Sequence, residues 1–253
     1  MAKQKRLNKN LVAFLTVMGV IIIIAVFTLI VYQGSRRDPE VLAESARASR
    51  AANDLDEARR RFLRAYEASE QRGKPNTQYV IDAAGCLFEM GELPSWYGLL
   101  EKISAKVPND PSLIIAQLEG HWHIRGIVGF VLNPSLWRDA SEKLLKLDKE
   151  SLLAKTSLAQ GLWQLGGPEN EQPADELAQQ AFAQAPTDPR VVLTYIIYLQ
   201  RQMSADISAA QTAGRPISER QAISKKILAD AIAVLEAALA EHPGDVPLVV
   251  AYR

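Results

Sequence analysis

Aspartate–proline pairs that recur at nearly even intervals constrain the fold of this 253-residue chain more than any other feature. They lie at Asp38-Pro39, Asp110-Pro111 and Asp188-Pro189, so their spacings are 72 and 78 residues. Each pair is typical of a helix start, because aspartate caps free backbone N–H groups and proline suits the first helical position. Further candidate starts, at Asn76-Thr77 and near Asp148, divide the two intervals. Half-spacings of 36 and 39 residues indicate an array of helical repeats.

Each repeat is predicted to contain two helices joined by a short turn, which makes the chain all-α. The branched and aromatic run at 191–199 is compatible with a strand, but its Asp-Pro start favours a helix. The expected first helices are Pro39–Ala52, Asn76–Met90, Pro111–Arg125, Ser151–Leu165 and Pro189–Met203. Their expected partners are Leu55–Gln71, Pro94–Lys106, Pro134–Leu147, Pro173–Ala185 and Ser218–Glu241. Gly91, Gly126 and Gly166 are expected to end first helices in the left-handed conformation that glycine adopts most readily.

The last complete unit is longer than the others. From Pro189 to the next expected start at Asp245 the chain runs 56 residues. We assign the excess to an insert at 204–217, where an exposed loop is expected because the segment has no sustained apolar stripe. The apolar residues after Asp245 predict a first helix of a further repeat, so that the array at 38–253 would continue beyond Arg253. The alternative is that 246–252 forms a short cap.

An uncharged run of 22 residues, Leu11–Tyr32, precedes the repeats. As a helix it would span about 33 Å, close to the roughly 30 Å hydrocarbon core of a bilayer. A cleaved signal peptide fits less well, because its apolar region is usually about 7–15 residues long and ends in a small-x-small site. Four basic residues precede the run, and only Arg36 and Arg37 closely follow it. The sequence therefore predicts a cytoplasmic N-terminus at 1–10, a transmembrane anchor at 11–32, a linker at 33–37, and repeats on the far (in a bacterium, periplasmic) side.

The charge balance argues against nucleic acid as a partner. Residues 33–253 carry 25 basic and 29 acidic side chains, whereas phosphate contacts need clustered lysine and arginine. A basic run at 59–61 follows Asp56 and Glu57 at helical pairing distances. This pattern favours a solvated helix face over a patch that binds lipid headgroups.

Residue patterns that carry catalysis or metal binding are weak. Cys86 is the only cysteine, which excludes a multi-cysteine zinc site, and it is expected as a small buried residue. His121 and His123 are two apart on a predicted helix, so their side chains diverge by about 200° and do not share a metal. The tryptophans, at 96, 122, 137 and 163, are expected to fill space between helices. We therefore predict no enzyme activity, no cofactor and no metal site.

Small residues in the second helices resemble the tetratricopeptide repeat (TPR) family. That family places a small residue, a large one, another small one and a closing proline in this order. The pattern is carried by Ala231, Leu235, Ala238 and Pro243, by Ala174, Ala178, Ala181 and Pro186, and by Ala58, Phe62 and Ala65. The units around Trp96 and Leu136 depart from it, which leaves other helix-pair solenoids open.

The resemblance implies an α-solenoid whose first helices line a concave groove for a peptide or protein partner. Alignment on Gly85, Gly120 and Tyr198 implies the following groove residues: Asp82, Glu89, Gln117, His121, Arg125, Tyr195 and Gln202. The predicted function is a membrane-anchored scaffold for protein–protein interaction. Two alternatives stay open, namely the docking or assembly arm of a larger enzyme whose catalytic domain lies beyond residue 253, and a spacer without a groove ligand.

Overall fold

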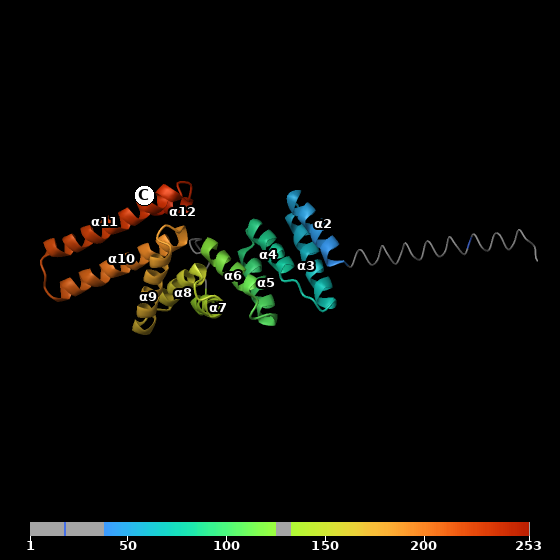
Figure 1. The fold of residues 1–253 in the computed structure, drawn as a ribbon, viewed down its shortest axis with the longest axis horizontal. Coiled ribbons are helices and arrows are strands. Elements are labelled where there is room, and N and C mark those ends of the chain that lie inside the picture. The colour runs from blue at the N-terminus through green and yellow to red at the C-terminus, as the bar shows by residue number, and fades with distance from the viewer. Residues whose placement is uncertain (1–17, 19–37, 125–132, 253) are drawn as a thin grey trace, which may run out of the picture. The chain divides into compact units, whose positions relative to one another are not determined.

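Figure 1 shows the fold of the computed structural model, which describes residues 18, 38–124 and 133–252. These residues form eleven helices and contain no strand, so the all-α prediction is confirmed for them. The helices are α2 (Pro39–Ala51), α3 (Leu55–Gln71), α4 (Gln78–Glu89), α5 (Leu93–Lys106), α6 (Pro111–Ile124), α7 (Pro134–Leu147), α8 (Leu152–Leu165), α9 (Pro168–Gln184), α10 (Pro189–Thr212), α11 (Ile217–Glu241) and α12 (Val246–Tyr252).

The predicted N-terminal anchor is not part of this description. The segments 1–10, 11–32 and 33–37 lie outside the described residues, except for Met18. Among the helices that are described, none combines the length and the apolar character needed to cross a bilayer. The anchor and its orientation therefore stay predictions.

The aspartates predicted to start helices act as caps. Asp38 Oδ1 accepts a hydrogen bond from the backbone N–H of Glu40 at 3.0 Å. Asp110 Oδ1 accepts from the N–H groups of residues 112 and 113, and Asp188 Oδ1 from those of residues 190 and 191, at 2.9–3.1 Å. These bonds satisfy donors that have no partner inside the helix, which explains why the Asp-Pro spacing located the starts.

Two of the three glycines predicted to end first helices adopt the expected conformation. Gly91 follows α4 with φ of 75°, and Gly166 follows α8 with φ of 69°. Other residues adopt this left-handed region at a cost, so glycine permits the chain to reverse there. The third, Gly126, lies outside the described residues.

The prediction of an exposed loop at 204–217 is wrong. The first helix of this pair, α10, continues to Thr212, and only residues 213–216 connect it to α11. Nothing before Gly214 interrupts the helix, and Ala210 within the extension is buried. The excess residues therefore lengthen both helices of the pair to 24 and 25 residues rather than forming a loop.

The start of α9 differs from the prediction. A start at Pro173 was expected from the sequence, but the helix begins five residues earlier, at Pro168, and Pro173 lies inside it. Pro168 occupies the first helical position after Gly167, whose φ is 86°. Either proline could open a helix, and the structure uses the one that directly follows the turn.

The helices form two compact units, residues up to Pro108 (unit 1) and residues from Asn109 onward (unit 2). In unit 1, α2 packs on α3, α3 on α4, and α4 on α5. Unit 2 contains the helix pairs α6–α7, α8–α9 and α10–α11, and α12 packs on the last of these pairs. The first helices of unit 2 also contact one another, α6 with α8, α8 with α10, and α10 with α12. This stacking of neighbouring pairs is the arrangement expected of a helical-repeat solenoid.

Small side chains allow these helices to approach closely. Ala174 and Ala178 of α9 are buried in one cluster with Leu162 and Trp163 of α8. A Cβ atom at Gly161 of α8 would lie 3.4 Å from the backbone nitrogen of Arg138 in α7. All four tryptophans are buried between helices, as predicted.

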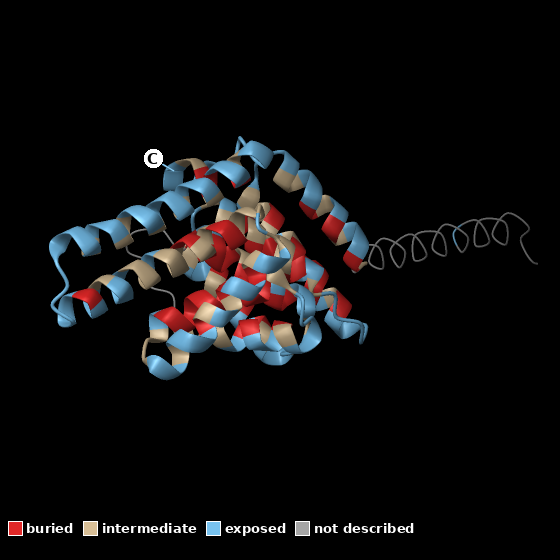
Figure 2. Cartoon of the chain, turned by 60° about the vertical axis from the view of Figure 1, so that its left-hand side comes forward, coloured by how far each residue is buried: buried red, intermediate tan, exposed pale blue. Residues whose placement is uncertain are grey.

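Burial is uneven within unit 2. Residues 153–163 of α8 are all buried, whereas α11 buries only Leu235 and Ala238. Figure 2 shows the buried residues gathered where helices pack, with much of the α10–α11 hairpin exposed. Helix α8 is therefore held by contacts on several sides, and it packs against both α6 and α10.

We predict that residues 38–108 fold when expressed alone, because α2–α5 pack in chain order within this segment. Circular dichroism should show a helical spectrum and a cooperative thermal transition. A fragment 38–91, which lacks the α5 partner of α4, serves as the control and should melt at a lower temperature. An unfolded spectrum for 38–108 would contradict its assignment as a compact unit.

Candidate functional site

A hollow of about 390 Å³ opens on the first helices of unit 2. We call it the α6–α10–α12 hollow. Helix α6 contributes Glu119, Trp122 and His123, α10 contributes its cap Asp188 with Pro189, Arg190 and Leu193, and the start of α12 contributes Asp245 and Pro247. Three helices that are far apart in sequence therefore supply one surface.

Polar contacts hold the walls of the hollow in place. Arg190 Nη2 donates to Glu119 Oε2 at 2.7 Å, which joins α10 to α6 across 71 residues of sequence. Trp122 Nε1 donates to Ser157 Oγ of α8 at 2.9 Å. Asp245 Oδ1 accepts from the backbone N–H of Leu248 at 3.0 Å and so caps α12. These contacts fix Glu119, Trp122, Arg190 and Asp245 in the lining of the hollow.

The lining combines apolar surface with an excess of carboxylates. Leu193 and the two prolines provide apolar area, while the charged lining consists of the carboxylates of Glu119, Asp188 and Asp245 and the guanidinium group of Arg190. Within the described part of the chain, no group of three or more histidine, cysteine, aspartate or glutamate side chains is arranged to hold a metal ion. The hollow therefore offers apolar contact area directly beside charged side chains.

The groove residues predicted in unit 1 lie on α4 and contact other residues of the unit. Asp82 Oδ1 accepts from Gln78 Nε2 at 2.9 Å. Glu89 pairs with Arg50 of α2, whose Nε lies 3.1 Å from Glu89 Oε1. Glu89 thus takes part in an ion pair that connects α2 with α4, whereas the hydrogen bond from Gln78 to Asp82 lies within α4.

The residues predicted in unit 2 do not line the α6–α10–α12 hollow. Gln117 is half-buried on α6, and Arg125 lies outside the described residues. His121 is 2% exposed and packs edge-on against Trp137 of α7, with ring centroids 5.5 Å apart. The structure therefore corrects the expected orientation of His121, because this side chain points into the core of unit 2.

Tyr195 and Gln202 likewise face the neighbouring helix α9. The Tyr195 ring stacks on Phe182, with centroids 3.9 Å apart and planes inclined by 7°. Gln202 Nε2 donates to Asp175 Oδ2 at 3.5 Å. Because one residue of error in such an alignment turns a helix by about 100°, the predicted groove residues on α6 and α10 and the lining of the hollow lie on different parts of the same helices. The helix starts predicted at Asp188 and Asp245 do line the hollow, but no sequence pattern showed that they lie together.

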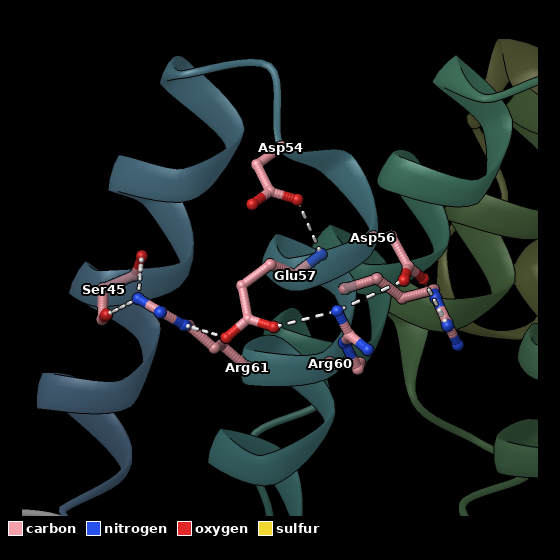
Figure 3. A network of polar contacts seen from close by, with 7 residues as sticks. Ser45, Asp54, Asp56, Glu57, Arg60 and Arg61 are labelled. Atoms are coloured by element: carbon pink, nitrogen blue, oxygen red, sulfur yellow. Dashed lines mark hydrogen bonds and ion pairs between the residues drawn. The ribbon is translucent and has the colours of Figure 1, made fainter.

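A second hollow, of about 570 Å³, lies beside α2 and α3 in unit 1. Figure 3 shows its polar network, in which Arg61 Nε donates to Glu57 Oε1 at 2.7 Å and its guanidinium also reaches Ser45. Arg60 pairs with Glu57 at 3.1 Å and with Asp56 at 3.4 Å. The predicted pairing of these arginines with preceding acids is confirmed, and their charges are largely compensated.

The stacked helix pairs form the tetratricopeptide repeat fold, which confirms the resemblance found in the sequence. The structure of YrrB, a TPR protein with an unusual peptide-binding site, has a TM-score of 0.53 and 12% identity, covering 87% of this chain and 94% of YrrB. The structure of MamA has a TM-score of 0.52 and 12% identity, and the match covers 83% of this chain and 93% of MamA. The structure of TTC0263, a thermophilic TPR protein of Thermus thermophilus, has a TM-score of 0.50 and 14% identity, and the match covers 85% of this chain and 96% of TTC0263. No protein-family model and no curated protein matches the sequence.

Burial lowers the pKa of His121 from its ordinary value of 6.5 to about 4, because the charged ring would be removed from water. Between about pH 4 and pH 6.5, His121 therefore binds a proton in the unfolded chain but not in the folded chain. The free energy of unfolding should therefore fall as the pH drops below 6.5, by about 2 kcal/mol between pH 7.5 and pH 5.

Urea denaturation at the two pH values measures this loss. His121→Leu should remove most of the pH dependence, whereas His123→Gln, at an exposed position on the same helix, should keep it. An equal pH dependence in the wild type and His121→Leu would show that His121 is not the group responsible.

Proposed function

We propose that this chain is a membrane-anchored TPR scaffold that binds a segment of a protein partner in the α6–α10–α12 hollow. The observation that carries the proposal is the hollow itself, in which three first helices converge on apolar and charged side chains. Interfaces of this kind combine a buried apolar centre with a polar rim that fixes the partner's orientation. The likeness to YrrB supports the proposal, since the same fold there carries a peptide-binding site.

The anchor is the second part of the proposal. Residues 11–32 are uncharged and long enough to cross a bilayer, and the basic residues before them favour a cytoplasmic N-terminus. The repeats, and with them the hollow, would then lie on the far side of the membrane. The scaffold thereby holds its partner at the membrane.

Site-specific crosslinking tests the partner-binding part. Cys86 is fully buried, and burial raises the pKa of its thiol, so a second cysteine can be labelled selectively. We expect full-length His123→Cys, labelled with benzophenone maleimide, to crosslink a protein in native membranes. Lys143→Cys on the exposed face of α7 is the matched control and should not.

The captured protein is then purified and titrated against the chain. Leu193→Asp should weaken its binding about tenfold or more, because it places a charge on the apolar wall, while Glu142→Lys on α7 should leave binding unchanged. Crosslinking of the same proteins from positions 123 and 143, or binding that is insensitive to Leu193→Asp in a folded variant, would contradict the proposal.

Membrane extraction and topology test the anchor. The full chain should remain in the pellet after an alkaline carbonate wash, and removal of residues 11–32 should release it. A reporter fused after Arg253 should be active outside the cytoplasm. A mature protein that starts near Gly34 would refute the uncleaved anchor, and a reporter active in the cytoplasm would reverse the orientation.

A further inference from the structure

We infer that the α6–α10–α12 hollow selects a basic segment of its partner, in which a lysine or arginine is flanked by apolar residues. The inference rests on the proposed function and adds the chemistry of the partner. It follows from the balance of charges around the hollow, from the position of its apolar wall, and from the ion pair that spans it.

Three carboxylates and one guanidinium group line the hollow, so their charges sum to a net negative value. The imidazole of His123 also lines it and is not counted in this sum. Arg190 is paired with Glu119. Among the described residues, no lysine or arginine forms an ion pair with Asp188 or Asp245, each of which caps a helix through one oxygen. These two carboxylates therefore present charge that a cationic side chain of a partner can complement.

Apolar surface lies next to this charge. Leu193 is half-buried on α10, one turn after Arg190, and Pro189 and Pro247 open α10 and α12. A lysine or arginine side chain suits such a place, because its methylene stem covers apolar surface while its charged end reaches a carboxylate. Apolar neighbours of that residue in the partner would add contact area on the same wall.

The wider charge distribution acts in the same direction. Residues 33–253 carry 25 basic and 29 acidic side chains, so the part of the chain that bears the hollow does not repel a basic partner. A net negative surface also raises the rate at which a basic segment meets the hollow, and this effect weakens as salt is added.

The ion pair between Glu119 and Arg190 allows a test in which two variants should act in opposite directions. Glu119→Gln and Arg190→Gln both remove the ion pair between these two side chains, so a role of this pair in stability alone predicts effects in the same direction. Charge recognition instead predicts that Glu119→Gln weakens the binding of a basic probe about two- to fivefold and that Arg190→Gln strengthens it by a similar factor. Glu142→Gln on α7 is the control for a change in net charge outside the hollow and should have no effect.

The experiment uses the full chain in lipid nanodiscs, panned against a phage-displayed library of random 12-residue peptides. The most enriched peptide that crosslinks to benzophenone-labelled His123→Cys is synthesised with a fluorescein label, and its Kd is measured by anisotropy. We expect enrichment of lysine and arginine next to apolar residues, opposite shifts for the two glutamine variants, and weaker binding in 0.3 M than in 0.05 M NaCl.

Other outcomes separate the inference from the proposed function. Peptides that crosslink at position 123 but are acidic or uncharged, or shifts in the same direction for Glu119→Gln and Arg190→Gln, would overturn the inference and leave the hollow as a binding site. Failure of every enriched peptide to crosslink at position 123, or no enrichment at all, would overturn both.

Discussion

Close packing of neighbouring helices through small side chains is the interaction on which this structure depends. One helix pair cannot bury its own apolar faces, so each pair is stable only when the next one covers it. Alanines in α9 and Gly161 in α8 make this approach possible, since a Cβ atom at Gly161 would already contact the backbone of α7 and a longer side chain would push the helices apart. The buried tryptophans then fill the wider gaps, and the stacked array of pairs follows from these contacts.

The same stacking explains where the candidate site lies. Because the first helices of unit 2 contact one another, the starts of α10 and α12 come close to the third turn of α6. Each start carries an aspartate for capping, so the helix caps also supply charge to the hollow. Residues that the fold needs to cap its helices thereby also set the charge of the proposed binding surface.

The sequence predicted the features that depend on local physical chemistry. Capping by Asp38, Asp110 and Asp188, the reversals at Gly91 and Gly166, and the burial of Cys86 follow from the residues themselves or their close neighbours. The lining of the hollow was not predictable, because it depends on how each helix is rotated about its axis. His121 illustrates this, since packing against Trp137 turns it into the core while His123 stays exposed. The continuation of α10 beyond residue 203 was not predictable from periodicity, because this part of the helix is largely exposed and carries no sustained apolar stripe.

The central claim is that the hollow on α6, α10 and α12 holds a segment of a protein partner, and hydrogen–deuterium exchange tests it most directly. The full chain in nanodiscs would be measured alone and with saturating amounts of its purified partner. The account predicts slower exchange in residues 119–124, 188–193 and 245–249, with α2–α5 unchanged. Protection confined to α2–α5, or to the exposed face of α7, would contradict it.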